Sequence, residues 1–363
     1  MAIRMGDSGV DPRLEVWREP VRGGYPDPGL FALPGIDQLR AMLDGRAPSC
    51  PLNHLVGVKL TEVGAGKATF TMPASPWLVS PQGGITVGAL AILADGPLGC
   101  AVQTALPSGT GYTTSELSLR VVWPAQVGTL LTAKGRLVHA GRRVALSEVL
   151  IEDDAERLIA HGSSLCFIFP PVSPLPVLPP SSQLVREPEY ATLDPYLRPV
   201  SGAIIPQDLW EKMSGLEMLT ALLGGELPAP PTHYLTGLSL VEAAHEQSAF
   251  TLPASEWLCP PTAKVQGGVI AMLADAALAG AIMAATPAAT AIASIDLKVN
   301  FLRPGIADGR ELLARGTIAH AGRSIAVAHS EVVNANGKRV ALATGSALLL
   351  PGRSASLVDL PID

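Results

Sequence analysis

The stretch Gln266 to Gly280, QGGVIAMLADAALAG, decides the fold. Two glycines open it, apolar residues fill every face of the expected helix, and Asp275 is the one ionisable residue within it. A helix that is hydrophobic all round is buried in a protein core or lies in a membrane. Because a lone carboxylate is costly in either setting, Asp275 is a candidate for a functional site.

The same pattern occurs earlier in the chain, at Thr86 to Gly99, TVGALAILADGPLG, with Asp95 in the corresponding place. From Gly35 to Pro124 the second copy follows the first at a constant distance of 180 residues, without a gap. The aligned pairs include Gly57 and Gly237, Phe70 and Phe250, Trp77 and Trp257, and Pro124 and Pro304. A register kept over that length indicates a tandem duplication.

Composition restricts the possible functions. Charged residues make up 16% of the 363, and the net charge of −6 comes without a basic run, which argues against nucleic acid or an anionic membrane as a partner. The four cysteines are scattered without a CxxC pair, which favours a reducing, cytoplasmic location and argues against zinc. We expect no metal and no cofactor. The first residues, MAIRMGDSGVDPR, lack the apolar region of a signal peptide.

The two apolar helices approach the length of membrane spans. An Asp in the middle of each helix opposes insertion, and no basic loops flank either one. Both helices also lie between segments of alternating polarity that indicate strands. We therefore interpret them as core helices of a protein that does not enter a membrane.

The order of elements is the same in both copies. A short amphipathic helix (Gly35 to Gly45; Gly215 to Gly225) precedes a hairpin (Leu55 to Pro73; Leu235 to Pro253), a loop with tryptophan, the apolar helix and a run of antiparallel strands. A sheet of that length that wraps one apolar helix predicts an α+β fold. The expected segments are an irregular arm at 1–34, domains at 35–169 and 207–351, a proline-rich linker at 170–206 and a tail at 352–363.

These motifs carry a family resemblance. The glycine pair opening a buried helix, an Asp nine residues after Gln266, then SIDLKVNFLRP and later HAGR, resemble the hotdog-fold acyl-CoA thioesterases of the PaaI type. The family has His-Gly-Gly where this chain has Gln266, Gly267 and Gly268. The first copy departs further, with Thr86-Val87-Gly88 at the aligned positions. The resemblance implies two tandem hotdog domains that form a pseudo-dimer within one chain.

A thioester hydrolase needs donors for the oxyanion and a group that delivers water or attacks directly. The free amides at a helix start suit the oxyanion, so Gly267 and Gly268 are candidates. Asp275 lies roughly 12 Å further along its own helix, at about 1.5 Å rise per residue, and cannot act at that helix start. We therefore predict that each Asp serves the helix start of the other copy, as in PaaI-like dimers.

One composite site would combine Asp95 and Thr114 with Gln266, Gly267 and Gly268. The other would combine Asp275 and Ser294 with the amides of Val87 and Gly88, and with Ser80 or Gln82. The resemblance implies that Thr114 and Ser294 orient water and that the Asp is a general base or nucleophile. The first site is favoured because its glycine pair is intact. Where the family often has Asn before His-Gly-Gly, this chain has Ser80 and Pro260.

Other interpretations stay open. Each Asp could cap a neighbouring backbone, the glycines could serve close packing alone, and Thr114 and Ser294 could be ordinary strand residues. Guanidinium groups suit the phosphates of CoA, and the candidates are Arg142, Arg143, Arg303 and Arg323. His139 and His320, in the repeated HAGR, are expected in turns and have no assigned chemistry.

The leading function is hydrolysis of acyl-CoA or a related pantetheine thioester. Two alternatives are a hotdog-type enoyl hydratase or dehydratase, which uses a histidine beside the acid, and a module that binds acyl-CoA without turnover. The resemblance further implies that double-hotdog chains associate as homo-oligomers.

Overall fold

The computed structural model describes residue 16 and residues 19–172 and 184–355. Each half contains one long helix, α4 (Val87–Gln103) or α8 (Gly267–Ala284), and six strands. In the first half the strands are β1 (Lys59–Gly64), β2 (Lys67–Pro73), β3 (Tyr112–Val121), β4 (Leu130–Ala140), β5 (Val144–Glu152) and β6 (Leu158–Ile168). In the second half they are β7 (Ser239–Ala244), β8 (Gln247–Pro253), β9 (Thr290–Phe301), β10 (Glu311–Ala321), β11 (Ile325–Val333) and β12 (Arg339–Pro351).

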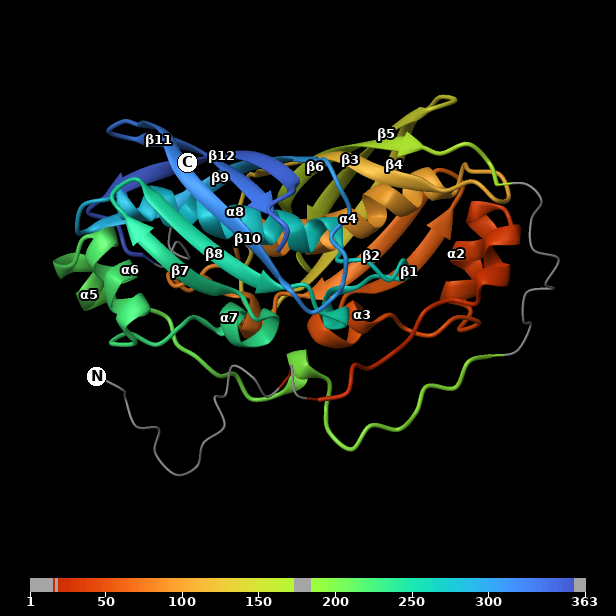
Figure 1. Cartoon of the computed structure of the whole chain (residues 1–363), viewed down its shortest axis with the longest axis horizontal. Coiled ribbons are helices and arrows are strands. Elements are labelled where there is room, and N and C mark those ends of the chain that lie inside the picture. The colour runs from red at the N-terminus through yellow and green to blue at the C-terminus, as the bar shows by residue number, and fades with distance from the viewer. Residues whose placement is uncertain (1–15, 17–18, 173–183, 356–363) are drawn as a thin grey trace.

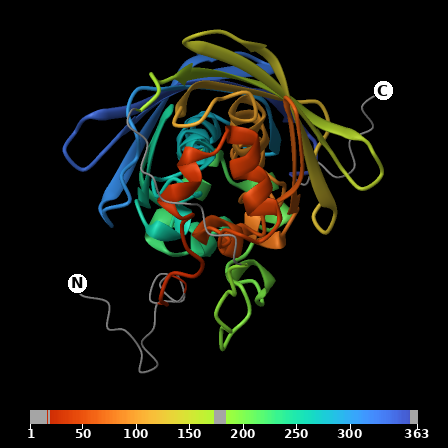
Figure 2. The same cartoon turned by 90° about the vertical axis from the view of Figure 1, so that its right-hand side faces the viewer.

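All twelve strands form one antiparallel sheet in the order β1-β2-β4-β5-β6-β3-β9-β12-β11-β10-β8-β7. The halves meet where β3 pairs with β9, and Ser118 lies opposite Lys298, its own counterpart in the duplication. The pseudo-twofold axis therefore passes through this pair. The sheet arches over α4 and α8, which lie beneath its two halves (Figures 1 and 2). The predicted α+β architecture, a curved sheet around each long helix, is confirmed.

The composition of the helices explains this arrangement. Apolar residues surround α4 and α8, so every face must be covered, and a curved sheet together with the partner helix does so. Strand glycines allow close contact, because an ideal Cβ at Gly135 would lie 2.3 Å from the Pro97 carbonyl oxygen of α4. The equivalent Cβ at Gly316 would lie 2.0 Å from the Ala277 carbonyl oxygen of α8. By length and composition α8 could cross a membrane, but 83% of it is buried inside the protein.

The predicted start of each hairpin is wrong, because a short helix occupies those residues in both halves. Leu55 belongs to α3 (Pro51–Val56) and Leu235 to α7 (Pro231–Thr236), so the first strands begin four residues later than expected. Both helices start at a proline and end at a glycine with positive φ, 76° at Gly57 and 77° at Gly237. Six residues are too few to show a helical hydrophobic period, and the segment therefore looked like the beginning of a strand.

The remaining helices cover the open side and the ends of the sheet (Figure 1). The predicted amphipathic pair is present as α2 (Gly35–Leu43) and α6 (Gly215–Gly224), while α5 (Gln207–Lys212) precedes α6. The arm expected to be irregular contains a short 3-10 helix, η2, whose bounds are Pro28–Ala32.

His139 and His320 lie in strands β4 and β10, so their predicted placement in turns is wrong. A bulge just before each histidine, between Leu137 and His139 and between Ile318 and His320, carries the strand on past it. Gly141 and Gly322 follow two residues after the histidines, and the turns begin there.

The described part of the linker crosses the surface away from the sheet and contacts the first half. Asp194 accepts a hydrogen bond from Arg22 at 2.9 Å and lies 3.0 Å from Nδ1 of His54 on α3. Residues 173–183 of the predicted linker, 1–15 and 17–18 of the arm, and 356–363 of the tail lie outside the described residues. The predicted domain boundaries stay a prediction.

Candidate active site

Each Asp lies at the start of the other half's long helix. The amide of Gly268 donates to Oδ2 of Asp95 at 3.1 Å, and the amide of Gly88 donates to Oδ2 of Asp275 at 3.0 Å. The Gly267 amide also stabilises the Asp95 carboxylate. We name Asp95 with Gly267 and Gly268 the first site, and Asp275 with Val87 and Gly88 the second site.

Glycine allows this approach because the two helices touch through their backbones. An ideal Cβ at Gly268 would lie 2.3 Å from the Ala91 carbonyl oxygen, and one at Gly88 would lie 2.7 Å from Cα of Met272. Any larger residue would push the helices apart. The helix start, with its unpaired amides and the positive end of its dipole, therefore faces the carboxylate directly.

Burial decides the protonation of both acids. Desolvation raises the pKa of Asp95 to about 6, and hydrogen bonds from Gly268, Thr114 and Gly267 oppose this rise. Desolvation raises the pKa of Asp275 to about 7, where only the amide of Gly88 opposes it. Asp95 is enclosed by protein atoms yet keeps some accessible surface, whereas the exposed fraction of Asp275 is 5%. The first acid can therefore meet solvent and ionise near neutral pH.

The two strand hydroxyls differ in their contact with the acids. Oγ1 of Thr114, on β3, lies 3.5 Å from Oδ1 of Asp95, at the outer limit of a hydrogen bond. Among the residues that the structure describes, Ser294 makes no hydrogen bond to Asp275, and it pairs with Ala347 across the sheet. The structure thus brings Thr114 to the first site, while Ser294 has no corresponding contact in the second.

Gln266 fixes the start of α8 against α4. Its side-chain Nε2 donates to the carbonyl oxygen of Ile92 at 3.1 Å, one turn before Asp95. The residue is 6% exposed, and its Oε1 has no hydrogen-bond partner among the described residues. A buried acceptor without a partner is costly, so the contact between the Gln266 side chain and α4 leaves one hydrogen bond unmade.

The decisive difference between the sites is one side chain. An ideal Cβ at Gly267 would lie 3.1 Å and 3.3 Å from the two carboxylate oxygens of Asp95, so any larger residue there would crowd the acid. The aligned residue in the second site is Val87, which is 2% exposed and carries a branched side chain from that position. We conclude that Gly267 leaves the helix start beside Asp95 partly exposed, whereas a buried, branched side chain covers the corresponding helix start in the second site.

Gln82 adds to the closure of the second site. Its Oε1 accepts a hydrogen bond from the backbone N–H of Ile292 on β9 at 3.1 Å, two residues before Ser294. Ser80, the other candidate, accepts a hydrogen bond from the Gln82 amide at 3.2 Å and thereby shapes the same loop. The hydrogen bonds of Gln82 and Ser80 are therefore made to other groups of the protein.

Three side chains near Asp95 were not identified from the sequence, namely Tyr112, Cys100 and Cys166. Burial raises the pKa of both thiols, to about 12 for Cys100 and about 11 for Cys166, so neither is an activated nucleophile. Tyr112 could have been found, because it lies two residues before Thr114 and therefore faces the same side of the strand.

The four candidate CoA-binding arginines are exposed. Arg142 and Arg143 lie between β4 and β5, and Arg323 lies between β10 and β11. The carbonyl oxygen of Arg143 accepts from Ile168, which pairs with Tyr112, so this turn lies at the same end of the sheet as Thr114. Arg303 donates to the carbonyl oxygen of Arg339 at 2.7 Å. Their role in binding CoA stays a prediction.

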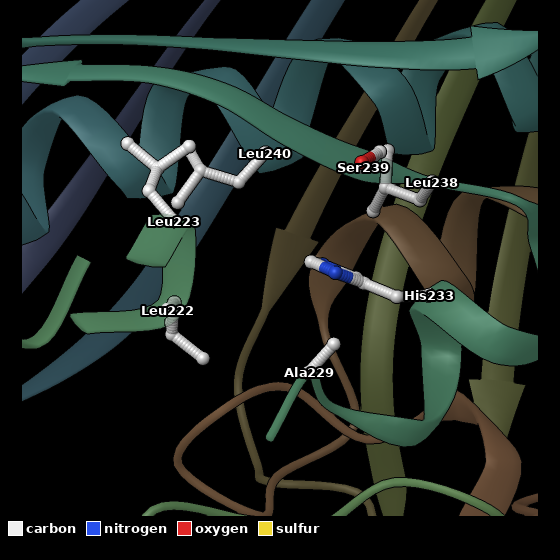
Figure 3. A pocket seen from close by; sticks show the side chains of 7 residues that line it. All are labelled: Leu222, Leu223, Ala229, His233, Leu238, Ser239 and Leu240. Atoms are coloured by element: carbon white, nitrogen blue, oxygen red, sulfur yellow. The ribbon is translucent and has the colours of Figure 1, made fainter. Parts of the chain in front are cut away.

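A separate pocket lies at the edge of the second half, between α6, α7 and β7 (Figure 3). His233 and Ser239 are its polar side chains, and the His233 ring packs edge-on against Phe250 at 6.0 Å. Neither Asp lines this pocket. No group of three or more His, Cys, Asp or Glu that could hold a metal is found within the described ranges.

Comparison with known proteins agrees with this geometry. The model of the thioesterase superfamily matches residues 83–160 and again 264–341, so each match contains one long helix and its Asp. The resemblance deduced from the sequence is therefore confirmed for both halves. A search of curated proteins finds no match.

Solved structures of similar length share the fold. A candidate thioesterase from Novosphingobium aromaticivorans is 21% identical, with 78% of this chain and 96% of that chain covered and a TM-score of 0.50. The tesB protein of Mycobacterium avium subs paratuberculosis is 15% identical, with 83% and 98% covered and a TM-score of 0.52. A protein of unknown function with a hot dog fold from Alicyclobacillus acidocaldarius is 13% identical, with 80% and 95% covered and a TM-score of 0.51. The chain is a tandem hotdog.

Proposed function

Since both halves of this chain are hotdog domains of the thioesterase superfamily, we propose that it hydrolyses acyl-CoA thioesters at the first site. The observation that carries this proposal is the Asp95 carboxylate, which is partly exposed and lies against the glycine-lined start of α8. A base and an oxyanion-binding helix start are thereby held within one hydrogen bond of each other.

In the proposed reaction the thioester carbonyl approaches the start of α8 at Gly267, which is partly exposed. The amide of Gly267, which faces Asp95 in the free protein, turns its hydrogen bond to the carbonyl oxygen of the bound thioester and stabilises the negative charge that develops on it. Asp95 removes a proton from water, and the resulting hydroxide attacks the carbonyl carbon. The carbon–sulfur bond then breaks, CoA leaves as a thiolate that takes up the proton, and the carboxylic acid departs. A pKa of about 6 gives Asp95 both the ionised state and useful basicity at neutral pH.

Thr114 and Gln266 support this chemistry. The Thr114 hydroxyl beside Asp95 can orient the attacking water, and the Gln266 side chain holds the start of α8 against α4 through the Ile92 carbonyl oxygen. Direct attack by Asp95 on the carbonyl, through a mixed anhydride, uses the same residues. Single-turnover hydrolysis in ¹⁸O-water distinguishes the two routes, because only direct attack places the label in the Asp95 carboxylate.

The test of the proposal is release of free thiol from a panel of acyl-CoA esters. Wild-type protein, Asp95→Asn, Asp275→Asn and the double variant are compared, and calorimetry measures CoA-ester binding in parallel. Loss of hydrolysis in Asp95→Asn with binding retained supports the proposal. A wild type that binds acyl-CoA but releases no thiol from any ester overturns it in favour of a binding module. Association of whole chains into homo-oligomers stays a prediction, which light scattering tests.

A further inference from the structure

Tyr112 contacts α4 one helical turn beyond Asp95. It begins β3, and its ring lies against α4 at Gly99, where an ideal Cβ would be 2.6 Å from the tyrosine Oη and 3.1 Å from Cε2. Gly99 follows Asp95 by four residues, so both occupy the same face of the helix. The absence of a side chain at Gly99 is what allows the ring to occupy this place.

The surroundings of the ring are mainly apolar. Tyr112 packs on a small apolar cluster, separate from the main core, that includes Val102, Cys166 and Ile168. Burial is the main cause that raises the pKa of the phenol, followed by the charges of Cys100, Cys166 and Asp95. The hydroxyl has no hydrogen-bond partner within the part of the chain that the structure describes.

The other directions from Asp95 along α4 are closed. Towards the start of α4, the backbone of Gly268 lies on Ala91, and the Gln266 amide covers the carbonyl oxygen of Ile92. Towards the core, Leu93 and Leu98 are fully buried. An acyl group whose carbonyl lies at the start of α8 beside Asp95 is therefore expected to extend along α4 towards Gly99.

The duplicated half lacks this arrangement. The residue aligned with Tyr112 is Ile292, and the residue aligned with Gly99 is Ala279. An aliphatic side chain thus replaces the aromatic ring, and a methyl group takes the place that the ring uses. The tyrosine belongs to the half whose Asp is accessible.

We propose that Tyr112 is an acyl-specificity residue, whose ring ends the acyl pocket between α4 and β3 and restricts the first site to short or compact acyl groups. This inference rests on the proposed hydrolysis at the first site. Tyr112 acts on the substrate by its bulk, so it is expected to set which acyl group is used and not the rate of the chemical step.

The experiment compares kcat/KM for a series of straight-chain acyl-CoA esters between wild type and Tyr112→Ala. The ratio of kcat/KM for the longest to the shortest ester should rise at least about tenfold in Tyr112→Ala, the scale of a few methylene contacts. Tyr112→Phe keeps the ring and should keep the wild-type ratio. Ile292→Ala, the matched change in the other half, should keep it too. Circular dichroism and thermal melts confirm that each variant is folded.

A ratio that stays within about twofold of wild type in Tyr112→Ala overturns the inference, as does an equal change in Ile292→Ala. Failure of the proposed function has a different signature, namely no thiol release by the wild type. In that case binding of non-hydrolysable thioether analogues decides. Tyr112→Ala must then gain affinity for the long analogue relative to the short one, and equal affinities overturn the inference.

Discussion

The first and second sites are built from the same parts and differ in access. Each has a buried Asp that accepts a hydrogen bond from a glycine amide at the start of the opposite helix. The first has Gly267 beside its acid and the second has Val87, and the exposure of the acids follows this difference. An Asp therefore caps a helix start in both sites, while only the acid of the first site is partly exposed.

The largest expected effect separates the two acids. Asp95→Asn should lower kcat/KM for acyl-CoA hydrolysis about 10³-fold, because the variant lacks the proposed general base. Asp275→Asn should change it by less than about threefold, because that acid does not meet substrate. Thiol release measures both. An equal loss in the two variants would break the comparison and establish two working sites.

Exchange of the residues that distinguish the sites should have the next largest effect. Gly267→Val should lower kcat/KM about a hundredfold, on the scale of one lost transition-state contact, because its side chain occupies the proposed carbonyl position. The reciprocal change, Val87→Gly in the Asp95→Asn background, should raise thiol release about tenfold above that background. If Gly267→Val keeps full activity, the start of α8 beside Asp95 is not the reaction centre.

The pH dependence of kcat/KM should reflect the protonation of Asp95, the acid of the first site. With the pKa of Asp95 raised to about 6 by burial, kcat/KM should fall about tenfold for each pH unit below that value, as the base becomes protonated. Asp275→Asn provides the control and should have the same profile. A profile that is flat between pH 5 and 7, roughly one unit on either side of that pKa, would exclude an acid with this pKa as the base.

The pH dependence of the free energy of unfolding should reflect the protonation of Asp275, the acid of the second site. Burial raises the pKa of Asp275 from its ordinary value of 3.8 to about 7, so between these values the folded chain binds a proton that the unfolded chain does not. The free energy of unfolding should therefore fall as pH rises from about 4 to about 7, by on the order of 2 kcal/mol. Asp275→Asn should remove this part of the dependence.

Urea unfolding at several pH values measures the effect. Asp95→Asn serves as the matched comparison. It should remove a smaller part of the pH dependence of the unfolding free energy, over a narrower pH range that ends at about 6. If Asp275→Asn unfolds with the same pH dependence as wild type, the acid is not held in its protonated form.

The sequence predicted the elements that depend on long-range pattern. A constant register over both copies identified the duplication, and the distance along one helix from Gly267 to Asp275 required that each acid act at the opposite helix. The structure has both acids in that position, although their catalytic role stays a prediction. The short helices α3 and α7 were missed, because one and a half turns leave no periodic signal.

Side-chain access in the sites could not be predicted in the same way. The exchange of Gly267 for Val87 is visible in the sequence, but its effect depends on a distance of about 3 Å to a carboxylate on another helix. The contact between Tyr112 and Gly99 likewise depends on how β3 lies over α4, which no local pattern records. These features come from tertiary packing.

The joined sheet, in which β3 of one half pairs with β9 of the other, has a consequence for how the protein behaves on dilution. A composite site shared by two separate chains is lost when the chains dissociate. Here the linker holds both contributors at a fixed effective concentration, whatever the amount of protein in solution. The rate per molecule should therefore stay constant down to the lowest concentrations at which it can be measured.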